Sequence, residues 1–102
     1  MRKEHQSGTW DYLVRAAEQR ERSFGVEVHP ATASEVQAVI EKRDAAVRTL
    51  ERRGLRGFVE RGDWCWIASG KVYLRPTDGE SRRLAKAGIR APVRVLRLPP
   101  DR

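Results

Sequence analysis

Residues 62–76 read GDWCWIASGKVYLRP, and this stretch decides the fold that the sequence predicts. Apolar and polar side chains alternate on both sides of the pair Ser69-Gly70. A two-residue loop of this kind is typical of the tight turn between two antiparallel strands. We therefore expect a central β-hairpin over about residues 64–75, with its turn at Ser69-Gly70.

The predicted hairpin has two different faces, because successive side chains of a strand point to opposite sides. One face is apolar and is expected to belong to the core: Cys65, Ile67, Val72 and Leu74. The other face joins three aromatic rings to two cations: Trp64, Trp66, Tyr73, Lys71 and Arg75. Three interpretations of this second face stay open: burial under a helix, a contact between subunits, or a surface on which the rings stack bases while the cations hold phosphates.

Helices are expected on both sides of a short strand that precedes the hairpin. Apolar residues at helical spacing predict a helix from Trp10 to Arg22, with Thr9 as its N-cap. Alternation then predicts a strand over Ser23–His29, which Pro30 ends. The spacing Thr32-x-x-Glu35 is typical of a capping box, and it predicts a long helix that runs to about Arg53 and stops at Gly54.

The remaining segments complete an α+β domain. Leu55–Val59 is expected to be a connector or short strand, Glu60–Asp63 a turn, Gly79–Ala87 a short helix and Val93–Leu98 a last strand. The predicted fold is a small antiparallel sheet with the hairpin at its centre, packed by two or three helices in the order α-β-α-β-β-α-β. Residues 1–102 form one domain, with flexible tails at 1–8 and 99–102.

Composition predicts a soluble, cytoplasmic protein, of bacterial or phage origin as one option. A third of the residues are charged, and no apolar run is long enough to span a membrane or to follow the polar N-terminus as a signal peptide. Cys65 is the only cysteine, so it has no partner for an internal disulfide. We expect it to behave as a small apolar core residue in a reducing compartment.

The net charge of +7 lies entirely in the second half of the chain. Residues 1–51 hold 8 basic and 9 acidic side chains, whereas residues 52–102 hold 13 and 5. Such an asymmetry indicates a polyanion or another acidic partner. Our first hypothesis is a non-catalytic nucleic-acid-binding protein of low sequence specificity. Its expected contacts are Arg52, Arg53, Arg56, Arg61, Lys71, Arg75, Arg82, Arg83, Lys86, Arg90, Trp64, Trp66 and Tyr73.

The alternative is a protein–protein interaction module, such as a regulator, inhibitor or assembly subunit, possible as a homodimer. In that hypothesis the long helix contacts an acidic protein surface through Arg43, which interrupts the apolar stripe of the helix. The other interpretation is that Arg43 lies at the edge of the core and extends its charged group into solvent.

No catalytic signature accompanies these features. The two histidines are His5, in the expected tail, and His29, at a strand end where it is expected to be a surface residue. Asp63 and Asp78 flank the predicted hairpin and could approach each other as a carboxylate pair, but turn and capping roles explain both. No phosphate-binding glycine loop follows a strand. We therefore expect no enzyme activity, no cofactor and no metal.

Overall fold

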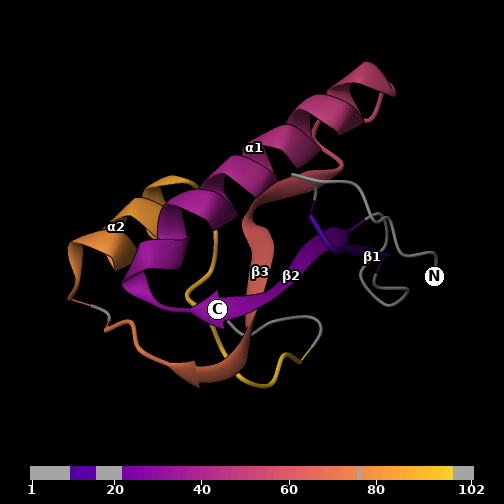
Figure 1. Cartoon of the computed structure of the whole chain (residues 1–102). Coiled ribbons are helices and arrows are strands. Elements are labelled where there is room, and N and C mark those ends of the chain that lie inside the picture. Colours follow the sequence, from indigo (N-terminus) through magenta and orange to yellow (C-terminus); the bar gives the residue numbers. More distant parts are fainter. Residues whose placement is uncertain (1–9, 16–21, 76, 98–102) are drawn as a thin grey trace.

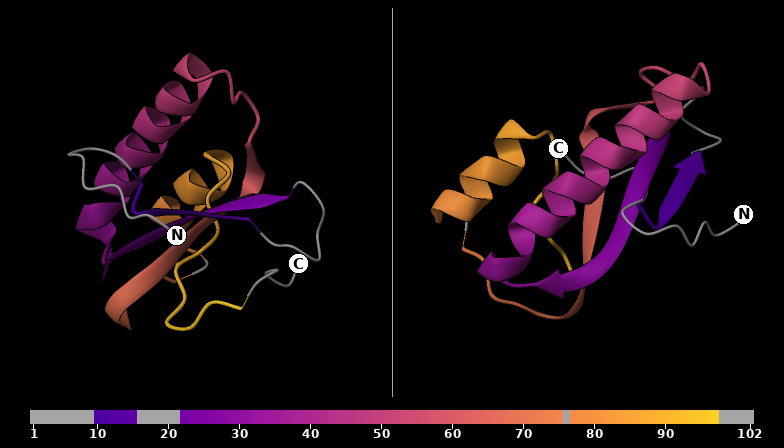
Figure 2. Two further views of the ribbon diagram at one scale, coloured as in Figure 1. Left: turned by 90° about the vertical axis from the view of Figure 1, so that its right-hand side faces the viewer. Right: turned by 45° about the horizontal axis from the view of Figure 1, so that its top comes forward.

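The fold is α+β, a mixed three-stranded sheet with two α-helices on one of its faces (Figures 1 and 2). The computed structural model describes residues 10–15, 22–75 and 77–97. Its elements are β1 (Tyr12–Arg15), β2 (Ser23–Ala31), the 3-10 helix η1 (Ala33–Glu35), α1 (Val36–Arg52), β3 (Val59–Val72) and α2 (Gly79–Lys86). In the described part of the chain, no helix is long and apolar enough to cross a membrane.

The sheet is built around a β2-α1-β3 unit. β2 lies between β1, which is antiparallel to it, and β3, which is parallel to it. Parallel neighbours require a crossover connection, and α1 supplies it by running back across the sheet. The helix places Val36, Val39, Ala46 and Leu50 toward the sheet, where all four are buried.

The core on the helix side depends on a close approach between β2 and β3. Gly25 is the register partner of Trp64, and a Cβ added at Gly25 would lie 2.3 Å from an atom of the Trp64 ring. Trp10 packs edge-on against Trp64, with ring centroids 5.2 Å apart. Only glycine leaves room for the indole at this point. Trp66 is also fully buried on this side, and its indole N–H donates to the His29 carbonyl oxygen at 2.9 Å.

The opposite face of the sheet carries a second, smaller apolar cluster. Phe24, Val26 and Cys65 are buried there, with Ile67 and Leu96 packed beside them. Leu96 belongs to the C-terminal segment, which crosses to this side after α2 (Figure 2). Both faces of β2 and β3 are therefore covered, as is usual for parallel strands.

The segment after α2 also covers the free edge of β3. Bridges join Trp64 to Ile89 and Ile67 to Val93, both in the parallel sense. Backbone hydrogen bonds of 2.8 Å from Gly62 to Gly88 and from Ala68 to Val93 support them. Residues 88–93 thus act as an irregular fourth strand.

The predicted hairpin is wrong, because Ser69 and Gly70 lie inside a continuous β3. A two-residue turn would have placed Ile67 and Val72 on one face, whereas an unbroken strand puts them on opposite faces. Val72 and Leu74 accordingly pack with the helix-side cluster, while Cys65 and Ile67 lie in the other. Of the three interpretations of the aromatic face, the structure shows burial under a helix for Trp64 and Trp66.

Other local predictions have mixed outcomes. The strand from Ser23, the long helix and the short helix from Gly79 are confirmed as elements, but Pro30 lies inside β2 instead of ending it, and α1 begins at Val36 after η1. The predicted N-terminal helix is wrong where it is described, since Tyr12–Arg15 is a strand; residues 16–21 lie outside the described part.

The predicted turn and the predicted last strand also differ from the structure. Glu60–Asp63 lies within β3 as a bulge rather than a turn: Gly62 has a φ of 85°, and β3 gains extra residues between the partners of Ser23 and Gly25. Val93 forms a single bridge in place of the predicted last strand. The predicted tails, 1–8 and 99–102, lie outside the described residues.

The close approach of β2 and β3 predicts that Gly25→Ala destabilises the fold. The added methyl group collides with the Trp64 ring, and overpacking of this kind costs about 2–3 kcal/mol. Gly70→Ala is the matched control in β3, because a Cβ there meets nothing within 4 Å, and its effect should stay within about 0.5 kcal/mol. Urea unfolding of both variants measures the difference; equal midpoints would contradict the packing argument.

Candidate functional site

The clearest cationic surface lies on α2. Arg82, Arg83 and Lys86 are exposed and recur at spacings of one and three residues, which places them on one side of the helix. With Gly79 and Ala85 they line a shallow open hollow. Leu84, on the opposite side of the helix, is 1 % exposed and anchors α2 in the core. The cations are therefore held outward by the packing of their own helix.

Two further arginines extend this surface to both ends of α2. The Arg61 guanidinium donates to the Lys86 carbonyl oxygen at 2.7 Å, at the C-terminal end where the helix dipole favours a cation. Arg75 precedes the helix, and its backbone N–H donates to the Asp78 carboxylate at 3.0 Å. We call Arg61, Arg75, Arg82, Arg83 and Lys86 the α2 face.

The α2 face is positive on balance, because its five cations outnumber the two acids of the same segment, Asp78 at the N-cap and Glu80 in the first turn of α2. Ion pairs join Arg22 to Asp63 at 2.9 Å, Lys42 to Glu27 at 2.7 Å and Arg43 to Asp44 at 3.0 Å. None of the five cations of the α2 face forms an ion pair with a residue of the described ranges. Arg83 donates instead to the neutral side chain of Gln37, in the first turn of α1.

The structure separates the thirteen residues predicted to bind nucleic acid. Five form the α2 face. Arg52, Arg53 and Arg56 lie at or just beyond the C-terminal end of α1, away from α2 (Figures 1 and 2). Lys71 and Tyr73 are exposed at the end of β3, and Tyr73 is 64 % exposed. Arg90 is half-buried beside the second apolar cluster.

The proposed role of the two indoles as stacking groups is corrected by the structure. Trp64 is 2 % exposed and Trp66 is 0 % exposed, so neither ring offers a face to a base. Arg43 likewise does not present itself to a partner, since its side chain is 18 % exposed and pairs with the adjacent Asp44. Its position fits the interpretation of a charged residue at the edge of the core.

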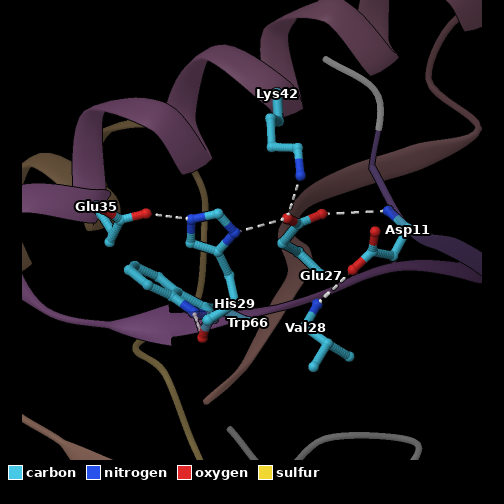
Figure 3. A network of polar contacts seen from close by, with 7 residues as sticks. All are labelled: Asp11, Glu27, Val28, His29, Glu35, Lys42 and Trp66. Carbon is cyan, nitrogen blue, oxygen red and sulfur yellow. Dashed lines mark hydrogen bonds and ion pairs between the residues drawn. The ribbon is translucent and has the colours of Figure 1, made fainter. Parts of the chain in front are cut away.

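A polar network at the start of α1 was missed by the sequence analysis (Figure 3). Its centre is Glu27, whose side chain is 0 % exposed. One carboxylate oxygen accepts from Lys42 Nζ at 2.7 Å and faces His29 Nδ1 at 3.2 Å; the other accepts from the Asp11 backbone N–H at 3.2 Å. On its other side, His29 Nε2 lies 2.6 Å from Glu35 Oε1. These contacts satisfy a carboxylate that would otherwise be costly to bury.

The network does not have the geometry of an active site. Glu27 is sealed from solvent, and both ring nitrogens of His29 already face carboxylates. No group of three metal-ligating side chains occurs in the described part of the chain. The predicted carboxylate pair is also not formed by a hairpin: Asp63 lies near the start of β3 and binds Arg22, whereas Asp78 follows the end of this strand and precedes α2.

Comparison of the chain with protein-family models, with curated proteins and with solved structures finds no match.

Cys65 lies under the second apolar cluster and is chemically protected there. Burial raises the pKa of its thiol to about 11, although the positive charge of Arg90 acts in the opposite direction. Because the thiolate is the reactive form, the native chain should keep this thiol protonated at neutral pH.

We expect Cys65 to react slowly with an aromatic disulfide reagent. A pKa of about 11 in place of 9.0 lowers the thiolate fraction at pH 7.5 by about 100-fold. Labelling should therefore be at least about 100-fold slower in native buffer than in 8 M urea, as followed by absorbance. Similar rates in the two solutions would show that the thiol is accessible and contradict its placement.

Proposed function

We propose that the protein is a small, non-catalytic nucleic-acid-binding protein of low sequence specificity, which holds phosphate groups on the α2 face. One observation supports this proposal above the others: five cations surround α2 without an acidic partner among the described residues. Lys and Arg contacts to phosphates supply most of the affinity in sequence-independent binding. Arginine also matches the geometry of a phosphate group with two parallel N–H donors.

Low specificity follows from what the α2 face lacks. Reading a base sequence requires side chains that reach base edges or rings that stack on bases. The α2 helix has eight residues, about 12 Å of helix, and its exposed side chains on this face are long cations. The one exposed aromatic ring of the predicted set, Tyr73, could stack on a single base beside Arg75.

Binding should weaken steeply with salt. If all five cations contact phosphates, the slope of log K against log salt should be about −4. Fluorescence anisotropy with labelled single- and double-stranded oligonucleotides of two unrelated sequences measures it. We expect similar affinities for the two sequences. No detectable binding to any of them at about 50 mM salt would end the proposal.

A matched pair of triple variants tests the location of the site. Arg82→Gln, Arg83→Gln and Lys86→Gln together should lower the affinity by about 10-fold or more and make the salt slope shallower by about 3. Arg48→Gln, Arg52→Gln and Arg53→Gln remove the same charge at the other end of α1 and should change the affinity by less than about threefold. Equal losses in the two variants would assign binding to net charge instead of the α2 face.

A second candidate function is the protein–protein module, and an exposed apolar surface favours it. Val28, Val93 and Val95 are 40 %, 39 % and 77 % exposed, and Val28 continues the face of β2 that carries Phe24 and Val26. Light scattering after nuclease treatment distinguishes this function: a stable homodimer or protein complex without nucleic acid favours it, whereas a monomer that binds oligonucleotides favours the first proposal.

A further inference from the structure

His29 stands between two carboxylates that belong to different elements. Nδ1 faces Glu27 on β2 at 3.2 Å, and Nε2 faces Glu35 on η1 at 2.6 Å (Figure 3). An ionised carboxylate has no proton to donate, and a neutral imidazole has only one N–H. With both carboxylates ionised, the two contacts are hydrogen bonds at once only when both ring nitrogens carry a proton, so the geometry favours an imidazolium.

Protonation of His29 balances the charges within the series of ion pairs from Glu35 to Lys42. Glu27 and Glu35 contribute two negative charges, and His29 and Lys42 contribute two positive charges. Asp11 directs its carboxylate to the Val28 backbone N–H and offers Glu27 only its own N–H. β3 presents the Trp66 ring to His29, at 6.4 Å between centroids. A neutral His29 would leave one excess negative charge and would turn a ring lone pair toward a carboxylate oxygen.

The network lies where β2 passes into α1. Pro30, Ala31 and Thr32 connect His29 to η1, and α1 follows directly. The expected capping bond of Thr32 is absent, and its hydroxyl lies 3.1 Å from Ser34 Oγ. Glu35 is bonded to His29 instead of capping the helix. The contact between His29 and Glu35 is therefore the side-chain tie that the structure shows between β2 and the beginning of the helical segment.

We propose that His29 is a proton-dependent latch: its imidazolium fastens Glu35 of η1, and with it the start of α1, to β2, and loss of the proton loosens this contact while Val36 and Val39 stay packed in the core. Histidine is the side chain that changes charge near neutral pH. Because the latch requires the imidazolium, the stability that it contributes is present while the ring is charged and is lost as the pH rises and the proton leaves.

The latch stands independently of the nucleic-acid proposal, although it reaches the same surface. Gln37 lies in the turn that the latch holds, and it accepts the hydrogen bond from Arg83 of the α2 face. Loosening of η1 would weaken this support of Arg83 without changing the charge of the α2 face.

NMR tests the protonation state directly. His5→Gln leaves His29 as the single histidine, so the long-range ¹H–¹⁵N spectrum of that variant reports on one ring. We expect both ring nitrogens of His29 to be protonated at pH 6.5. A neutral ring at pH 6.5 would overturn the proposal, because one of the two ring nitrogens would then lack the proton that its contact with a carboxylate requires.

Stability across pH tests the consequence. From pH 6 to 8.5 the folding constant of the His5→Gln background should fall, by up to about tenfold per pH unit, and His29→Gln should remove this slope. Amide exchange in residues 33–38, corrected for the intrinsic rate, should accelerate over the same range. An unchanged slope in His29→Gln would overturn the latch.

A milder variant covers the case in which His29→Gln does not fold. Glu35→Gln keeps an oxygen acceptor for Nε2 but removes the negative charge, so the NMR titration of His29 should move to lower pH. Glu41→Gln is the matched control, since Glu41 is exposed on α1 and bonds only to Gln37 among the described residues. Equal titrations in these two variants would contradict the contact with Glu35.

Discussion

The fold depends on the contact between an indole ring and a strand backbone. Trp64 occupies the space that any side chain at Gly25 would fill, and this fixes how closely β3 can approach β2. The same register places Trp66 beside Glu27 and so brings a buried carboxylate under α1. The core and the polar network thus both depend on the register between two parallel strands. A shift of this register by one residue would move both indoles to the opposite face of the sheet.

Local sequence signals predicted the elements better than their pairing. The two α-helices and β2 follow from capping, periodicity and alternation within each segment. The hairpin failed because a Ser-Gly pair is compatible with either a turn or a bend in a long strand, and the choice is made by a partner about 40 residues earlier in the chain. The N-terminal prediction failed for a similar reason: the spacing of Trp10, Leu13 and Val14 fits a helical face, but pairing with β2 outweighs that preference.

The candidate sites show the same difference between what local sequence reveals and what packing decides. Charge asymmetry is a property of composition, so it identified the cations of α2 without knowledge of the fold. Which aromatic rings are accessible, and which acids neutralise which cations, depends on packing that no spacing reveals. Glu27 is the clearest case: it lies on the side of β2 opposite to Phe24 and Val26, and α1 covers that side. A lone acid in an otherwise apolar strand was the signal that could have suggested burial.

The late pairing of β3 has a consequence for the chain as it is made. β2 is synthesised before β3 and pairs with one of its edges. The other edge of β3 pairs with residues 88–93, which are synthesised after it. Val93 follows Val72 by 21 residues, so translation at about 5–20 residues per second leaves that edge without its partner for about 1–4 s. During this interval the unpaired edge of β3 can pair with the same edge of another newly made chain.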